Sequence, residues 1–203
     1  MGGLRGVKHY LQRTALQGSP TMITAVTGVY QPHAKGIHRD IHPFKKYFDD
    51  LQIGEQLITE KRVITSEDID RFADLTGDHF YAHIKTTDFT GTMFEQQVAH
   101  GYFIMSIAAG LFVDGFEKNP VLLNYGIDEL RFTKPVYPGA EVHIRFTCKE
   151  KLPNDKRVIE KPEDFKRGDD IDKGIVKWLV EFFDETNEIT GVATILTMVA
   201  KRP

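Results

Sequence analysis

The stretch VAHGYFIMSIAAGLFV, residues 98–113, is the longest apolar run in the chain and decides its fold. It is shorter than the roughly 20 residues that a membrane-spanning helix needs, and His100 and Gly101 interrupt it. We therefore expect a buried helix and no membrane contact. A helix that is apolar on all sides must be enclosed by other elements, so its neighbours should wrap around it.

The segments on either side supply that enclosure. Residues 55–64 have the composition of a strand, and Thr65 then begins a helix-capping pattern whose apolar periodicity stops at Gly77. Four strand candidates follow the apolar run, at 121–134, 140–149, 174–184 and 188–200. This order predicts an α+β fold with one sheet wrapped around a central helix.

Three details of the strand region are expected as well. Gly191 indicates a β-bulge in the last strand, and the charged stretch 153–172 indicates a long solvated connection. Cys148 falls on the apolar face of its strand, where a thiol is buried and inert.

Length and composition limit the number of domains and the kind of partner. The chain of 203 residues suits a single core. A stretch rich in proline, glycine and histidine at 28–43 reads as a linker, so we predict a segment over 1–43 followed by a domain over 44–203. The net charge of −3 gives no general attraction to nucleic acid or anionic lipid, and neither is expected as a partner.

The single cysteine rules out an internal disulfide and favours a reducing compartment, so a cytoplasmic location is expected. The first 39 residues carry basic side chains and no acidic one, which also suits an organellar presequence. That alternative stays open.

The stretch LTGDHFYAHI, residues 75–84, has the composition of a reaction centre. A neutral imidazole at His83 can accept a proton near neutral pH, and a carboxylate at Asp78 can share a water molecule with it. The alternative is a plain turn, in which Asp78 binds turn amides and His83 packs as a half-buried ring. This stretch alone leaves both readings open.

A metal site is not expected here. His79 and His83 have the i, i+4 spacing of metal ligands and Asp78 lies beside them. However, this spacing brings two imidazoles together only in a helix, and the pair follows Gly77 with no third ligand nearby.

His100 and Gly101 open the apolar helix, where unpaired N–H groups and the positive end of the helix dipole favour an oxyanion. A glycine there lets a substrate carbonyl approach the main chain. The alternative is that Gly101 only lets the helix start close to the sheet.

Three stretches carry a specific resemblance: FADLTGDHFYAH (72–83), VAHGYF (98–103) and LRFTKPVYPGAEV (130–142). Together they resemble the MaoC-type hydratase family. The resemblance implies a hot-dog fold, a curved antiparallel sheet around a long helix. It also implies catalysis by Asp78 and His83, with the backbone at Gly101 as oxyanion donor.

The same resemblance implies an α,β-unsaturated acyl-CoA thioester as substrate and no metal or redox cofactor, because CoA is part of the substrate. It further implies a homodimer or a larger homo-oligomer. Two departures stand out: Phe80-Tyr81 replace a common Asn-Pro, and Lys85 replaces a common Asp.

One branch of the family is closer still. GDHFYAH, AAGLFVD and LLNYGIDELRF resemble the C-terminal hydratase domains of bifunctional phenylacetate-degradation proteins, the PaaZ branch. Residues 1–19 resemble the end of the aldehyde dehydrogenase domain that precedes them. This implies a dehydrogenase remnant and linker over 1–43, hydrolytic ring opening of oxepin-CoA, and an aldehyde dehydrogenase as a possible partner.

Two other functions compete with hydration. The hot-dog scaffold also supports acyl-CoA thioesterases, in which water attacks the thioester carbonyl. A non-catalytic acyl-CoA-binding or assembly module is the second alternative, and the charged stretch 153–172 would be its contact surface.

Overall fold

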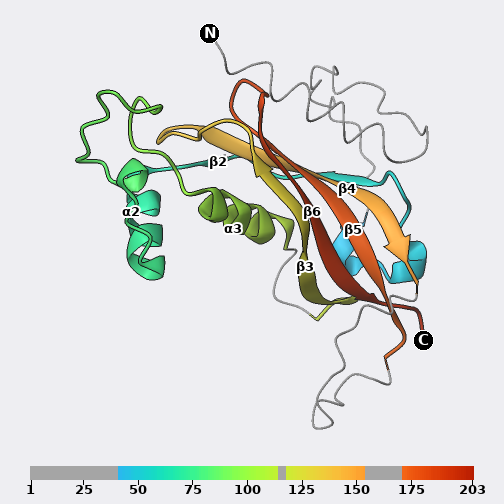
Figure 1. Ribbon diagram of the computed structural model, residues 1–203. Helices are drawn as coiled ribbons and strands as arrows, with labels where there is room; N and C mark the ends of the chain where they lie inside the picture. The colour runs from blue at the N-terminus through green and yellow to red at the C-terminus, as the bar shows by residue number, and fades with distance from the viewer. Residues whose placement is uncertain (1–40, 114–117, 154–170) are drawn as a thin grey trace. The chain divides into compact units, whose positions relative to one another are not determined.

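A computed structural model describes residues 41–113, 118–153 and 171–203 of the chain (Figure 1). The expected dehydrogenase remnant over 1–43 lies outside the described residues except at its last three positions. Most of the charged stretch 153–172 lies outside them as well. Within the described part, no helix is long and apolar enough to cross a membrane.

The sheet has six strands in the described residues, all paired antiparallel. Its order is β1-β4-β5-β6-β3, and β2 also pairs with β4. The strands are β1 (Gln56–Ile58), β2 (Arg62–Val63), β3 (Val121–Phe132), β4 (Glu141–Leu152), β5 (Lys173–Phe183) and β6 (Ile189–Ala200).

The strand expected over 55–64 is present as two short pieces, β1 and β2, and both pair with β4. Between them Thr59 still bonds to β4, donating its N–H to the Ile144 carbonyl at 2.9 Å and accepting the Ile144 N–H at its hydroxyl at 3.0 Å. The side chain of Thr59 takes the place of a main-chain acceptor, so the ladder is interrupted there.

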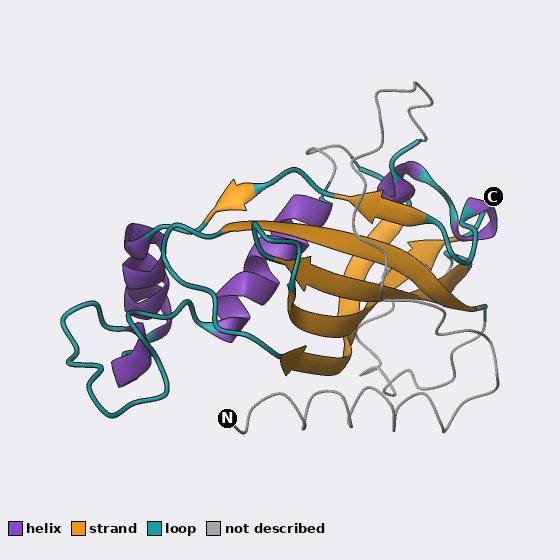
Figure 2. Cartoon of the chain, turned by 90° about the horizontal axis from the view of Figure 1, so that it is seen from above, coloured by secondary structure: helices purple, strands orange, loops and turns teal. Residues whose placement is uncertain are grey.

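The helical elements are α2 (Ser66–Thr76), α3 (Gly101–Phe112) and three short 3-10 turns, η1 (Pro43–Lys45), η2 (Phe48–Asp50) and η3 (Tyr81–His83). Figure 2 shows α3 beside the curved strands, with α2 beyond one end of it. The expected α+β architecture, one sheet around a central helix, is confirmed.

The apolar helix is buried on one side only: Tyr102, Ser106 and Gly110 along its other side are exposed, so the expected enclosure on all sides is only partly present in this chain. Near its C-terminal end, the ring of Phe112 stacks on Phe146 of β4 with 3.9 Å between centroids and meets Trp178 of β5 edge-on at 5.1 Å. None of these three side chains is more than 2 % exposed. The helix starts at Gly101 and not at Val98, because residues 98–100 are extended and bond to other segments.

The helix α2 ends where the sequence indicates. The Thr65 hydroxyl accepts the N–H of Asp68 at 3.0 Å, and the Asp68 carboxylate accepts the N–H of Thr65 at 3.3 Å, which completes a capping box. At the other end Gly77 has φ 77°, a left-handed conformation that glycine adopts without strain. The loop that follows leaves the helix in a fixed direction.

The bulge expected at Gly191 is present one residue earlier. Phe182 pairs with Gly191 and Phe183 with Ile189, so Thr190 is the extra residue. Cys148 is fully buried on the inner face of β4 as expected, and burial raises the pKa of its thiol to about 11.

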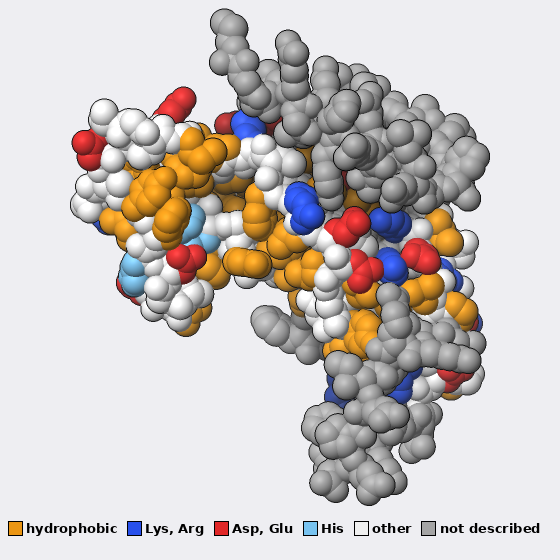
Figure 3. Space-filling model, viewed as in Figure 1, with side chains coloured by type: hydrophobic (Ala, Val, Ile, Leu, Met, Phe, Trp, Pro, Cys, Tyr) orange, Lys and Arg blue, Asp and Glu red, His pale blue; other side chains and the backbone are white. Residues whose placement is uncertain are grey.

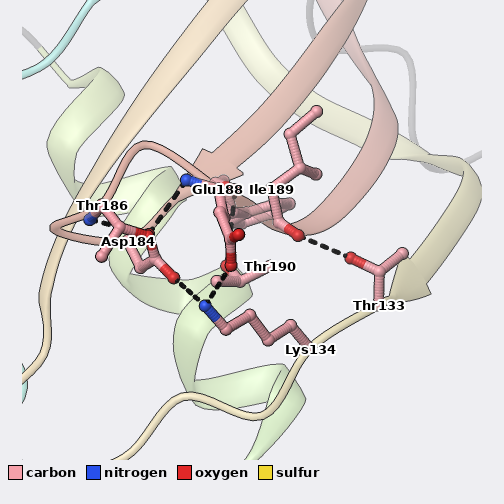
Figure 4. Close-up of polar contacts among 8 residues, drawn as sticks. Thr133, Lys134, Asp184, Thr186, Glu188, Ile189 and Thr190 are labelled. Atoms are coloured by element: carbon pink, nitrogen blue, oxygen red, sulfur yellow. Dashed lines mark hydrogen bonds and ion pairs between the residues drawn. The ribbon is translucent and has the colours of Figure 1, made fainter. Parts of the chain in front are cut away.

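A polar clamp holds the segment after β3 against the β5–β6 hairpin (Figure 4). Lys134 donates to the buried Asp184 at 2.5 Å and to Glu188 at 2.6 Å. Burial alone would raise the pKa of Asp184, but hydrogen bonds from Lys134 and from the turn outweigh it and lower that pKa. Two residues further on, the Val136 carbonyl accepts the N–H of Ala99 at 2.8 Å. The clamp therefore fixes the entry to α3.

Replacing Phe112 by Ala removes the ring that joins α3 to β4 and β5. We expect the free energy of unfolding to fall by about 3–5 kcal/mol, the usual cost of deleting a buried aromatic ring. Chemical denaturation with urea measures it. Leu75→Ala is the control, since Leu75 is 83 % exposed and should change stability by no more than about 0.5 kcal/mol. Equal effects of both changes would contradict the enclosure of α3.

Candidate active site

The loop between α2 and α3 is pinned by one buried amide. Gln97 is 4 % exposed; its Nε2 donates to Asp70 of α2 at 2.9 Å and to the His83 carbonyl at 2.8 Å. Its Oε1 accepts the hydroxyl of Ser66, also on α2, at 2.6 Å. Every hydrogen-bonding atom of the amide group is thus used to hold η3 against α2. Nothing in the sequence motifs singled out Gln97.

His83 ends the 3-10 turn η3 and is half-buried. Its Nδ1 lies 2.7 Å from the Val98 carbonyl oxygen. A carbonyl can only accept, so Nδ1 carries the proton of the neutral ring and Nε2 keeps its lone pair. The structure therefore gives His83 the tautomer that a general base requires.

Asp78 lies on the loop just past the α2 C-cap, with an exposed side chain. One carboxylate oxygen accepts the Phe80 N–H at 3.3 Å, so the turn expected for Asp78 is partly formed. A ligand atom of Asp78 and one of His83 also lie within 4.8 Å of each other. The structure thus brings Asp78 and His83 together and leaves the carboxylate accessible.

His100 is the residue at this site that the sequence reasoning missed. It is 2 % exposed, and its ring stacks on His83 with 3.7 Å between centroids and 26° between planes. Its Nε2 lies 2.9 Å from the Asp78 carbonyl oxygen, so Nε2–H donates there. The available signal was the His before Gly101 at the helix start, but a stacking partner cannot be read from spacing.

Burial controls the charge of His100. Desolvation lowers its pKa, and the hydrogen bond to Asp78 offsets this only in part. His143 on β4 behaves alike: burial lowers its pKa, helped by the positive charges of Lys61 and Arg145. Both rings are therefore neutral in the native protein near neutral pH.

Gly101 has a packing reason to be glycine. A Cβ atom built there would lie 2.2 Å from the ring of Phe132 at the end of β3. This supports the alternative that the glycine lets α3 start close to the sheet. The backbone N–H groups of the first turn are a separate matter, because no side chain among the described residues caps that end of α3. They remain available to an oxyanion.

Asp78, His83 and His100 are also close enough for a metal ion to be considered, with ligand atoms within 4.8 Å of one another. The stacked rings, however, point their lone pairs along nearly parallel planes, whereas a tetrahedral ion needs them to converge. The described residues do not place His79 in this group. Its Nε2 lies 3.9 Å from Asp74 instead.

The two departures from the family pattern also have places in the structure. Phe80 and Tyr81 are 55 % and 41 % exposed and touch each other, with 4.5 Å between centroids. Lys85 pairs with Asp70 of α2 at 2.8 Å, so a cation here is accommodated by a carboxylate. Figure 3 shows the surface near α2, where imidazole and carboxylate groups lie among apolar side chains.

An antiparallel sheet packed around an apolar helix defines a hot-dog protein, and its helix N-terminus carries a cluster of two stacked imidazoles and a carboxylate. Solved structures agree on the fold. A monoamine oxidase regulatory protein from Archaeoglobus fulgidus is 26 % identical with a TM-score of 0.65, covering 78 % of this chain and 96 % of its own. A Mycobacterium tuberculosis protein with a double hot-dog fold is 17 % identical with a TM-score of 0.60, covering 80 % of this chain and 46 % of its own.

The family model described as MaoC like domain matches residues 50–166. "Protein MaoC" of Klebsiella aerogenes is 48 % identical over 160 residues, which are 79 % of this chain and 48 % of that protein. The "3-hydroxybutyryl-CoA dehydratase" of Methylorubrum extorquens is 31 % identical over 112 residues, 55 % of this chain and 69 % of that protein. The chain belongs to the family of MaoC-like dehydratase domains. It spans about half the length of the Klebsiella protein.

The two neutral buried histidines predict how stability depends on pH. Their native pKa values are lowered, so below about pH 6.5 the unfolded chain binds protons that the native state does not. We expect the free energy of unfolding to be intact above about pH 7. It should fall as the pH drops below about 6.5 toward the lowered native pKa values, by up to about 1.4 kcal/mol per pH unit for each ring, and level off below them.

Urea denaturation between pH 5 and pH 8 measures this slope. His143→Gln should make it shallower, whereas His79→Gln, at an exposed position, should leave it unchanged. A slope that is the same in all three proteins would show that the native pKa of His143 is not lowered.

Proposed function

We propose that this domain hydrates α,β-unsaturated acyl-CoA thioesters with a water molecule held by Asp78 and His83. The observation that carries the proposal is the His83 tautomer: Nδ1–H donates to the Val98 carbonyl, which leaves Nε2 as a base beside an accessible carboxylate. The dehydratase relative supports the same chemistry, because hydration and dehydration are one reaction in opposite directions.

In the proposed reaction, water adds across the carbon–carbon double bond. His83 Nε2 accepts a proton from the water while Asp78 accepts its second hydrogen bond, and the oxygen attacks the β-carbon. The electron pair of the double bond moves onto the thioester oxygen. The protonated imidazole then returns its proton to the α-carbon, which restores the base and completes the addition.

The negative charge that develops on the thioester oxygen needs a donor. The first turn of α3, beginning at Gly101, supplies uncapped backbone N–H groups and the positive end of the helix dipole. Donors of this kind each contribute about 3–4 kcal/mol to transition states. The scheme requires neither a metal nor a redox cofactor, and CoA enters as part of the substrate.

In its narrower form, the proposal names oxepin-CoA as the substrate. The β-carbon of that compound carries the ring oxygen, so hydration there gives a hemiketal whose collapse opens the ring to a 3-oxoacyl thioester and an aldehyde. An aldehyde dehydrogenase would consume the aldehyde, in a cytoplasmic setting. The resemblance of the motifs at 77–83, 108–114 and 122–132 to phenylacetate-degradation hydratases supports this form.

The test follows the ultraviolet absorbance of the conjugated thioester when the protein is mixed with crotonyl-CoA and, separately, with oxepin-CoA. Asp78→Asn and His83→Ala should each lower kcat by about 100- to 10,000-fold, because the first removes the carboxylate that orients the water and the second removes the base. Asp74→Asn and His79→Ala are matched controls on the same surface and should keep the wild-type rate.

Three outcomes separate the alternatives. Loss of conjugation without free thiol supports hydration, and release of free thiol identifies a thioesterase. Binding of the thioester without either change identifies a non-catalytic module. Activity on crotonyl-CoA alone would keep the general reaction and remove oxepin-CoA as the substrate.

We also propose that the domain pairs with a second copy of itself along β3. This strand of 12 residues is the last in the sheet order, and no other described strand pairs with its outer side. Leu123 and Ile127 on it are 46 % and 44 % exposed. A long edge strand with apolar side chains is a template for another strand.

Sedimentation velocity should give the mass of a dimer, and Ile127→Lys should convert it to a monomer, since a lysine on an edge strand opposes pairing. Val63→Lys is the control, at an exposed apolar position on β2. A wild-type monomer would disprove the pairing, as would a dimer that Ile127→Lys leaves intact.

A further inference from the structure

His100 is a buried titratable group that the proposed reaction does not use directly. Three contacts define its position: the stack on His83 at 3.7 Å, the hydrogen bond to the Asp78 carbonyl at 2.9 Å, and the ring of Phe72 at 5.0 Å. It thus touches both residues that are proposed to hold the water, while being 2 % exposed itself. A substrate cannot reach it.

We propose that His100 is a positioning residue for the reaction: its Nε2–H holds the Asp78 main chain, and its ring holds the plane of the His83 ring. This inference rests on the proposed hydratase function for its kinetic part only. The two actions use different parts of the imidazole, so they can be separated by substitution.

The hydrogen bond acts on Asp78. That residue lies in an exposed loop next to the left-handed Gly77, and its carboxylate has only a turn amide as partner in the described part of the chain. The bond from His100 to the Asp78 carbonyl ties this loop to the start of α3. A displacement of about 1 Å at a reacting group can cost about 100-fold in rate, so such a tie matters.

The ring acts on His83. The bond from Nδ1 to Val98 fixes one atom of the His83 ring but still allows the ring to turn about that bond. A flat surface 3.7 Å below removes this freedom. When His83 takes a proton from water, its cation lies over the face of a neutral ring, which is an attractive arrangement.

The neutral state of His100 follows from its surroundings. The titratable groups that act on it are His83, Asp78 and His79, and α2 contributes the apolar Phe72. A second positive charge at 3.7 Å from the His83 cation would be repulsive. Burial favours the neutral ring, and the hydrogen bond to the Asp78 carbonyl opposes it only in part.

The imidazole is not the choice that stability alone would make. With Nε2–H donated, Nδ1 is a buried acceptor that has no partner among the described residues. Leaving such an atom unpaired costs about 1–3 kcal/mol. A phenyl ring would remove this unpaired atom and, with it, only the bond from Nε2 to the Asp78 carbonyl, so that bond is what the imidazole adds.

Two variants divide the roles. His100→Phe keeps the stacking surface and loses the donor; His100→Gln keeps a donor and loses the ring. We expect each to lower kcat by roughly 10- to 100-fold with KM within about twofold, because the substrate is still bound but the reacting groups are misplaced. His100→Phe should be at least as stable as the wild type while being slower. His143→Gln is the matched control, with lower stability and an unchanged kcat.

A measurement independent of activity uses NMR of histidine-labelled protein. The protons on the His83 ring should show the upfield ring-current shift of a stacked neighbour in the wild type and in His100→Phe, and lose it in His100→Gln. Nitrogen shifts of His100 should show a proton on Nε2 and none on Nδ1 at neutral pH.

The outcomes are distinct. If the wild type is active and both His100 variants have the same kcat as the wild type, the positioning role is overturned. A missing ring-current shift, or a charged His100 at neutral pH, would overturn it as well. A wild type that hydrates neither crotonyl-CoA nor oxepin-CoA would disprove the hydratase function, and the NMR result would then still decide whether His100 orients His83.

Discussion

The burial of one apolar helix against the sheet is the constraint on which the rest of the structure depends. Burial of Phe112 against β4 and β5 requires the sheet to curve around α3. At the N-terminal end of the helix, Phe132 of β3 packs against Gly101, and the loop from α2 contacts His100. A polar site can form there because backbone N–H groups, imidazoles and a carboxylate meet at the edge of an apolar interior, where electrostatic interactions are strong and water still has access.

Much of this arrangement follows from local sequence. The strict alternation in 140–149 predicts a half-buried strand, and the structure has β4 at Glu141–Leu152. The cap at Thr65 and the glycine at Gly77 bound α2 correctly because capping depends on residues that are neighbours in sequence. The proximity of Asp78 and His83 can be predicted for a similar reason: the two residues are five positions apart across a short turn, so their side chains cannot lie far from each other.

Contacts between distant segments could not be predicted in this way. The stack of His100 on His83 depends on the main-chain bonds of residues 98 and 99 to Ala82 and Val136, and no sequence periodicity indicates those bonds. The packing reason for a glycine at position 101 could not be predicted either, because the ring that fills the space beside it comes from Phe132 at the end of β3. The break between β1 and β2 depends on the Thr59 hydroxyl, which replaces a main-chain acceptor. The composition of residues 55–64 does not show this break, because it still resembles that of a single strand.

The burial of Cys148 has a practical consequence for spectroscopy. With a thiol pKa of about 11, roughly one molecule in a thousand carries the reactive thiolate at pH 8, and the sulfur is out of reach of reagents. This is the chain's only cysteine. A fluorophore or spin label attached through a cysteine introduced at an exposed position would therefore report from that position alone, with the native thiol left in place.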